Sequence, residues 1–138
     1  MKTGDVLRVC LFELGQEAFA IESGAVRQVL NVPAPIALPS SGSGLQGLFA
    51  YQGRVIPLLN LHPLLVQPPS TGTLSVIVQS GGEQWAFGLD SVLDFTGVIL
   101  GGVSDRPYSK YEIEHGGTKA RLLDIRAIMN AFSQDLAA

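Results

Sequence analysis

The sequence predicts an all-β domain made of two similar lobes, with short helices and an amphipathic helix at the C-terminal end. Two observations carry this prediction. Short apolar runs alternate with glycine-rich turns along the chain, and the two halves share matching segments in the same order. The 138 residues are 46% hydrophobic, which is enough for one domain with a core of its own.

In the first half, alternating residues on either side of a glycine turn predict two β-hairpins, formed by residues 5–14 with 17–22 and by 48–51 with 55–60. Between the hairpins, residues 23–30 predict a short helical turn capped by Ser23. The Pro-, Ser- and Gly-rich stretch 33–44 predicts a loop, and residues 61–66 predict a short apolar turn or helix.

The second half repeats this succession of strands and turns. Strands are predicted at residues 73–79, 84–89, 92–99, 108–114 and 119–124. From Ile125 the apolar residues recur every three or four positions, which predicts a helix over about residues 125–136. Asp124 is placed to cap the start of this helix.

Matching blocks indicate an internal repeat. The aligned pairs are residues 18–23 with 86–91, Gly53 with Gly117, and 58–61 with 122–125. Two copies predict a pseudo-twofold pair of lobes rather than a solenoid. We expect lobe one at about residues 16–70 and lobe two at about 71–124, each completed by partner strands that cross from the other half. Because each lobe is small, the lobes should share apolar surface.

The same segments carry a family resemblance. Residues 47–61, with a glycine turn, a strand, a proline and a Leu-rich run, resemble the most recognisable segment of CheW-like domains. Residues 88–92 resemble the acidic step in the second lobe of that family, and residues 122–129 resemble its closing strand-to-helix turn. The resemblance extends from about Val6 to about Met129.

This resemblance implies two five-stranded, SH3-like β-barrel lobes with a groove between them. It also implies a non-enzymatic scaffold of a bacterial chemotaxis or motility array, which bridges the cytoplasmic tip of a methyl-accepting receptor and the regulatory domain of a histidine kinase. On this hypothesis the protein is a cytoplasmic adaptor of a two-component system. It uses no cofactor or metal, binds no nucleic acid and does not insert into a membrane directly.

The candidate partner contacts fall into two groups: the turn region with Gly47, Leu48, Gln52, Gly53 and Arg54, and the inter-lobe apolar positions Val32, Val98 and Ile99. The family usually has Asn-x-Arg-Gly at the turn, where its arginine is associated with receptor contact. This chain has Ala50-Tyr51-Gln52-Gly53 instead, and the amide of Gln52 cannot supply a guanidinium group.

The sequence contains no pattern typical of an active site. Cys10 lies in an apolar run and is expected to be buried, while His62 and His115 are expected in solvated loops. A small hydrolase or metal protein built on His62 or Cys10 is a rival hypothesis, but the sequence lacks the usual ligand spacings.

A second rival is a small β-barrel module for single-stranded nucleic acid, in which Trp85 and Phe87 would form a stacking platform. The formal charge of −3 and the absence of a basic run argue against it, and we expect Trp85 in the core. No run approaches the ~18 apolar residues of a membrane helix, and the first residues lack the apolar core of a signal peptide.

Overall fold

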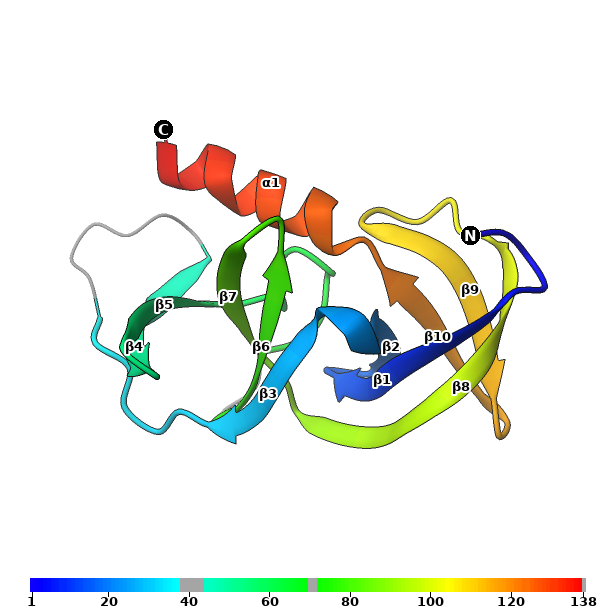
Figure 1. Ribbon diagram of the computed structural model, residues 1–138, viewed down its shortest axis with the longest axis horizontal. Coiled ribbons are helices and arrows are strands. Elements are labelled where there is room, and N and C mark those ends of the chain that lie inside the picture. Colours follow the sequence, from blue (N-terminus) through cyan, green and yellow to red (C-terminus); the bar gives the residue numbers. More distant parts are fainter. Residues whose placement is uncertain (38–43, 70–71, 138) are drawn as a thin grey trace.

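The computed structural model describes residues 1–37, 44–69 and 72–137. Within these residues the chain forms ten strands and one α-helix (Figure 1). The strands are β1 (Val6–Leu14), β2 (Glu17–Glu22), β3 (Val26–Asn31), β4 (Leu45–Tyr51), β5 (Arg54–Leu59), β6 (Leu74–Ser80), β7 (Glu83–Gly88), β8 (Ser91–Val103), β9 (Ser109–His115) and β10 (Thr118–Leu123). The helix is α1 (Ile125–Ala137). The predicted all-β class with a C-terminal helix is therefore confirmed.

The strands are distributed over two five-stranded sheets. Strands β1, β2, β10, β9 and β8 close into a barrel, and the second sheet has the order β3-β6-β7-β5-β4. Each sheet contains one parallel contact in equivalent places of the repeat, β2 with β10 and β5 with β7. Each sheet therefore combines the first two strands of one copy with the last three of the other.

This exchange of strands corrects the lobe boundaries expected from sequence. The second sheet uses residues 26–88, and the barrel uses residues 6–22 together with 91–123. The boundary expected at about residue 70 would separate β6 and β7 from β3, β4 and β5, although these five strands form one sheet. The matched segments were identified correctly, but they are equivalent strands of two interlocked sheets.

The second sheet is nearly closed by the chain that follows β3. Ile36 forms an antiparallel bridge with Leu48 of β4, with N···O distances of 2.8 and 2.9 Å in the two directions. Ile36, which lies in the predicted loop at 33–44, thus pairs with the edge strand β4 of the second sheet. Residues 38–43 of that predicted loop lie outside the described residues.

Tight turns connect the paired strands within each sheet. Gln52 and Gly53 both have positive φ, 49° and 76°, which is the signature of a type I′ turn between β4 and β5. The glycine pairs at 81–82 and 116–117 have the same signs, so all three hairpins use a turn that matches the strand twist. The hairpins predicted around residues 15, 53, 81 and 116 are confirmed.

Side-chain size separates the cores. The equivalent residues Phe19 and Phe87 lie in a large core shared by both sheets and the helix. Their small neighbours Ala18 and Ala86 face the interiors of the barrel and of the second sheet, respectively. Because a strand alternates its faces, large residues fill the space between the sheets while alanine fits inside the narrow barrel.

Helix α1 covers the junction between the two sheets, running across the top of Figure 1. Phe132 packs 6.4 Å from the Trp85 ring and 6.5 Å from the Phe87 ring. The Asp124 Oδ1 atom accepts a hydrogen bond of 3.1 Å from the Ala127 N–H, which confirms the predicted cap. Among the described residues, no helix has the length and apolar content needed to cross a membrane.

The helical turn predicted at residues 23–30 is wrong. Only Ser23–Ala25 form a 3₁₀ turn, and Val26–Asn31 form strand β3 against β6. The spacing of Val26, Val29 and Leu30 fits either a helix or a strand. The β-branched valines pack well on a pleated sheet, and the pairing with β6 decides between the two.

Candidate functional site

The β4–β5 turn projects from the second sheet. Gln52, Gly53 and Arg54 are exposed, and the adjacent Val55 is 68% exposed. The Tyr51 hydroxyl lies 3.5 Å from Gln28 Oε1, which links the base of the turn to β3. The turn region therefore exposes an amide, a guanidinium and an apolar side chain to solvent at one end of the molecule (Figure 1).

Gly47 and Leu48 support this turn from within the sheet. A Cβ atom on Gly47 would lie 2.7 Å from the Ile36 carbonyl oxygen, so only glycine allows the chain after β3 to approach β4 this closely. Leu48 is the partner of Ile36 in the closing bridge. Both residues thus hold the sheet together behind the exposed turn.

The three inter-lobe candidates for partner contact, Val32, Val98 and Ile99, differ in their exposure to solvent. Val32 is 8% exposed and lies in the interior cluster of the second sheet, and Val98 is 3% exposed and lies inside the barrel. Their side chains are packed and cannot offer an open contact, so the structure corrects their assignment. Ile99 is 65% exposed on the outer face of β8.

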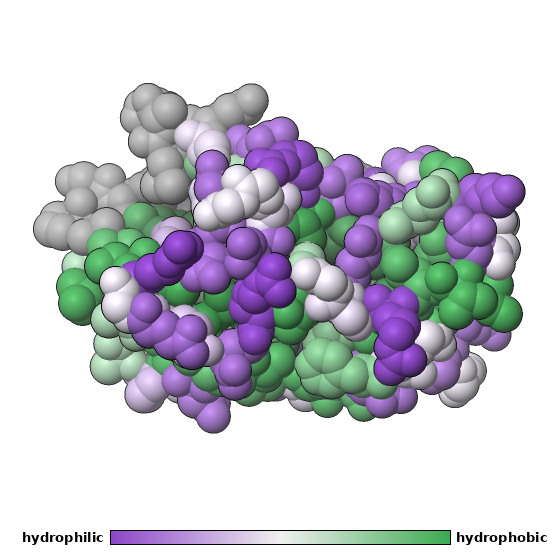
Figure 2. Space-filling model, in the orientation of Figure 1, coloured by the Kyte–Doolittle hydropathy of each residue, from purple (hydrophilic) through white to green (hydrophobic). Residues whose placement is uncertain are grey.

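Ile99 belongs to an apolar strip on the outside of the barrel, which we define by Val6, Phe95 and Ile99. Val6 is 73% and Phe95 50% exposed, and Val6 pairs directly with Ile99 across β1 and β8. Apolar surface is visible in Figure 2 over the lower and right parts of the molecule, where Figure 1 places β8. Arg8, exposed and paired with Gly97, lies on the same face between the Val6–Ile99 pair and Phe95, so one charged side chain interrupts the strip. Exposed apolar residues that gather in this way are typical of protein contacts.

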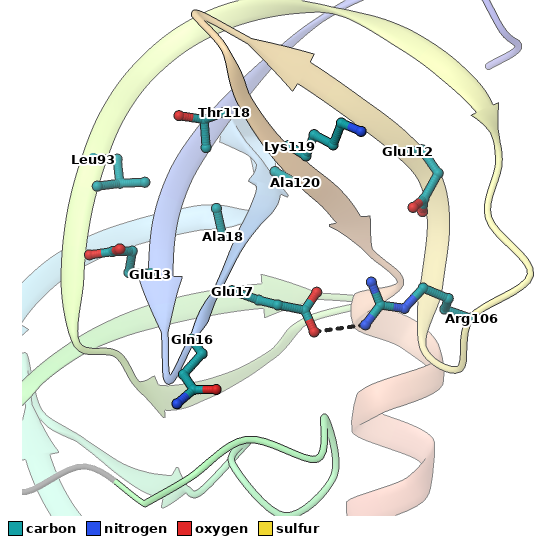
Figure 3. Close-up of a pocket in the computed structure, with 10 residues that line it drawn as sticks. All are labelled: Glu13, Gln16, Glu17, Ala18, Leu93, Arg106, Glu112, Thr118, Lys119 and Ala120. Carbon is teal, nitrogen blue, oxygen red and sulfur yellow. Dashed lines mark hydrogen bonds and ion pairs between the residues drawn. The ribbon is translucent and has the colours of Figure 1, made fainter.

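A third surface, at the mouth of the barrel, is polar. Figure 3 looks into this depression of about 570 Å³, which is lined by residues from all five barrel strands. Three acidic and two basic side chains line it, and the Arg106 guanidinium points toward Glu17 in the picture. Arg106 Nη2 donates a hydrogen bond of 2.7 Å to Glu17 Oε1.

Glu17 also forms an ion pair with a second arginine, Arg121. Arg121 Nε lies 3.5 Å from Glu17 Oε2, and Gln67 Nε2 donates to Glu17 Oε1 at 2.9 Å. Burial by itself raises the pKa of Glu17, but the hydrogen bond from Arg106 and the charges of both arginines outweigh it. The pKa of Glu17 is therefore lowered from 4.5, and the carboxylate stays charged at neutral pH.

Arg121 is a buried cation, with 3% of its surface exposed. Its Nη1 donates to the Pro107 carbonyl oxygen at 3.1 Å and to Ser109 Oγ at 2.8 Å, and the guanidinium lies 4.9 Å from the centre of the Phe19 ring. Its Nε has no hydrogen-bond partner in the described part of the chain. Burial, followed by the charge of Arg106, lowers the pKa of Arg121, while Glu17 opposes that change.

The two histidines, both expected in solvated loops, differ in their exposure to solvent. His62 is 6% exposed, so the expectation of a solvated loop is wrong for it. Its Nδ1 lies 2.7 Å from Asn60 Oδ1 and its Nε2 lies 3.6 Å from Asp90 Oδ1. His115 is part-exposed at the β9–β10 turn, 3.8 Å from Asp94. Over the described residues, no three His, Cys, Asp or Glu side chains gather in a group that could hold a metal ion.

Cys10 and Trp85 are buried, as expected from the sequence. Burial raises the pKa of the Cys10 thiol to about 11, which keeps it protonated and unreactive at neutral pH. Trp85 is 8% exposed and packs in the shared core, so it provides no open stacking platform. Sequence reasoning missed Glu17 and Arg121, although an arginine inside the apolar run 120–123 is a usable signal.

Comparisons with known proteins agree with this architecture. Residues 8–132 match the CheW-like domain family. A segment of 51 residues, 37% of this chain, is 29% identical to "Chemotaxis protein CheW" of Treponema pallidum and covers 30% of that protein's length. The crystal structure of the scaffolding protein TtCheW from Thermoanaerobacter tengcongensis superposes with a TM-score of 0.74 at 14% identity, covering 86% of this chain and 89% of that one. The chain belongs to the CheW-like domain family, a family of non-catalytic adaptor proteins of chemotaxis.

Proposed function

We propose that this protein is a cytoplasmic adaptor that couples the signalling tip of a methyl-accepting receptor to the regulatory domain of a histidine kinase. The observation that carries the proposal is the presence of two exposed surfaces on different sheets. One is the β4–β5 turn with Gln52, Arg54 and Val55, and the other is the apolar strip with Phe95 and Ile99. An adaptor needs two such surfaces, because it holds both partners at once.

The positions of these surfaces support simultaneous binding. Strands β4 and β5 lie at one end of the molecule, while β8 reaches the other end (Figure 1). The shared core and helix α1 join the two sheets into one packed body. A partner on the turn therefore leaves the apolar strip open to a second partner.

We assign the receptor tip to the β4–β5 turn. Gln52 stands where the family usually has an arginine, so this contact lacks the bidentate charged bonds of a guanidinium. Arg54 directly follows the turn glycine, is exposed and restores one positive charge close by. A single receptor contact of this protein should therefore be weaker than one made through the family's arginine. In an array, many such contacts act together, and avidity compensates for the lower affinity of each.

We assign the kinase regulatory domain to the apolar strip. Phe95 and Ile99 are large side chains held on a rigid closed barrel, and their burial against a partner would supply the affinity. The scaffold acts through geometry, by fixing where one partner stands relative to the other. This role requires no reaction at the barrel mouth or at His62.

Isothermal titration against the kinase regulatory domain and the receptor tip encoded beside this gene tests the proposal. We expect dissociation constants of order 100 μM or tighter for each partner. Ile99→Asp should weaken kinase binding at least tenfold and leave receptor binding unchanged. Val55→Asp is the matched control on the other sheet and should have the opposite selectivity. Absence of binding for both partners at about 100 μM protein would refute the proposed coupling.

A further inference from the structure

The side chain of His62 lies where the two sheets meet. His62 follows β5 of the second sheet, and Asp90 lies in the connection from β7 to the barrel strand β8. The His62 Nε2 atom lies 3.6 Å from Asp90 Oδ1. Asp90 is in turn fixed to the barrel, because its N–H donates to the Glu13 carbonyl oxygen at 3.0 Å and its Oδ2 accepts from the Gly15 N–H. A contact between His62 and Asp90 therefore joins the second sheet to the barrel.

The hydrogen bonds around His62 determine which nitrogen carries the proton of the neutral ring. Asn60 Oδ1 accepts from the backbone N–H of His62 at 3.1 Å, so the Asn60 side chain must turn its oxygen, and not its amide nitrogen, toward His62. The same oxygen lies 2.7 Å from His62 Nδ1. Since an amide oxygen only accepts, Nδ1 must donate, and the neutral ring holds its proton there.

This assignment leaves Nε2 of the neutral ring as a bare acceptor. The atom is buried without a hydrogen-bond partner in the described part of the chain, and it faces an oxygen of the Asp90 carboxylate. A proton on Nε2 makes it a charged donor on the side of Asp90. The contact therefore becomes an ion pair when His62 takes up a proton.

The acids of the barrel hairpin beside this turn have other partners. Glu13 on β1 accepts from Ser91 Oγ at 3.0 Å. Glu17 on β2 is paired with the two arginines at the barrel mouth, Arg106 and Arg121. Asp90 is thus the acidic group that the described residues bring to the His62 ring.

The internal repeat supplies an independent comparison. Extending the aligned block 58–61 with 122–125 by one position pairs His62 with Arg126, and the block 18–23 with 86–91 pairs Asp90 with Glu22. Arg126 and Glu22 line one small cavity of about 130 Å³ to which both sheets contribute. Arginine stays charged throughout the physiological pH range, whereas histidine changes its charge between about pH 5 and 8. The repeat therefore places a switchable cation where its counterpart is permanent.

We propose that His62 is a proton-sensitive latch between the two sheets: a proton bound at Nε2 ties the second sheet to the barrel through Asp90 and the Gly15 turn. The latch closes as the pH falls and opens as the pH rises. The second sheet carries the β4–β5 turn and the barrel carries the apolar strip, so the latch sets how firmly these two surfaces are held relative to each other. It is a property of the fold and does not depend on which partners bind.

Long-range ¹H–¹⁵N spectra of the ¹⁵N-labelled full chain report the protonation of each ring nitrogen. At about pH 8 we expect His62 to have a protonated Nδ1 and a bare Nε2. As the pH is lowered to about 5.5, Nε2 should gain its proton, and the Gly15 N–H signal should move together with it. The control variant His115→Gln, at the part-exposed histidine of the β9–β10 turn, should retain both changes.

A double-mutant cycle measures the strength of the latch. His62→Gln, Asp90→Asn and the double variant are compared with wild type by urea unfolding at about pH 5.5 and about pH 8. The interaction of the two residues should change the unfolding equilibrium constant at least about fivefold at the lower pH and less than about twofold at the higher. The matched control is the pair of His115 with Asp94 at 3.8 Å, whose side chains are 37% and 54% exposed. Its interaction should stay below about twofold at both pH values.

Any of three results would overturn the latch. The first is a His62 ring that carries its proton on Nε2 at about pH 8, since such a ring already donates toward Asp90 without a further proton. The second is a Gly15 signal that does not follow the titration of His62, and the third is equal interaction of His62 with Asp90 at the two pH values. The spectra use the wild-type chain, so they decide the question even if a variant does not fold. Neither measurement involves a kinase or a receptor, so the outcome is independent of the adaptor function.

Discussion

Replacing Glu17 by Gln removes the carboxylate that pairs with both Arg106 and Arg121 while keeping the shape of the side chain. The exposed pair with Arg106 contributes up to about 1 kcal/mol. The buried guanidinium of Arg121 matters more, because its side chain is only 4% exposed and would lose its countercharge. Breaking a fully buried pair costs about 3–5 kcal/mol, and the 29% exposure of Glu17 reduces that figure.

We therefore expect Glu17→Gln to lower the free energy of unfolding by about 2 kcal/mol at pH 7, since the Gln oxygen still accepts from Arg106 and Gln67. For a chain of this size, this corresponds to a Tm decrease of about 6 °C. Urea unfolding followed by circular dichroism measures the change. Glu83→Gln, at an exposed carboxylate that begins β7, is the control and should change stability by less than about 0.5 kcal/mol.

The pH dependence separates this explanation from a packing effect. The pKa of Glu17 is lowered in the folded protein from 4.5, so its stabilising contribution is present above about pH 4.5. The contribution is lost as the pH falls through the lower folded pKa. The difference between wild type and Glu17→Gln should thus shrink from pH 5 toward pH 3. A constant difference over that range, or a loss below 0.5 kcal/mol at pH 7, would refute the ion-pair account.

Three further outcomes are expected. The Cys10 thiol, whose pKa is raised to about 11, should react with a disulfide reagent at pH 8 only after unfolding, and reaction of the native protein within seconds would contradict its burial. Gly47→Ala should destabilise the protein by about 1–3 kcal/mol because its Cβ meets the Ile36 carbonyl, whereas Gly24→Ala, which meets open space, should be near neutral by the same urea assay. Asp124→Ala should cost about 1 kcal/mol through loss of the α1 cap, and an unchanged Tm would show that the cap is dispensable.

Local patterns predicted most of the secondary structure. Strand alternation, the glycine pairs and the helical spacing after Asp124 each depend on residues that are close in sequence. The repeat of Phe19 and Phe87 also indicated two related lobes. Residues 23–30 show the limit of this approach, because their apolar spacing fits two structures and only the distant strand β6 selects one.

Features that depend on distant pairing could not be predicted in this way. Strands that cross between the halves were expected from the repeat, but which strands cross depends on the parallel contacts of β2 with β10 and β5 with β7, and no local pattern records these contacts. Glu17 and Arg121 come together only through the first of these contacts. For the same reason Val32 and Val98 could be identified as apolar from sequence, but not as interior rather than exposed.

In the proposed function, one copy of this protein holds a receptor tip and a kinase regulatory domain at the same time. Sedimentation velocity of the three purified components at about 100 μM tests it directly. We expect a ternary complex that is larger than either binary one and is lost with either Ile99→Asp or Val55→Asp. Competition between the two partners for a single surface, with only binary complexes at every ratio, would contradict it.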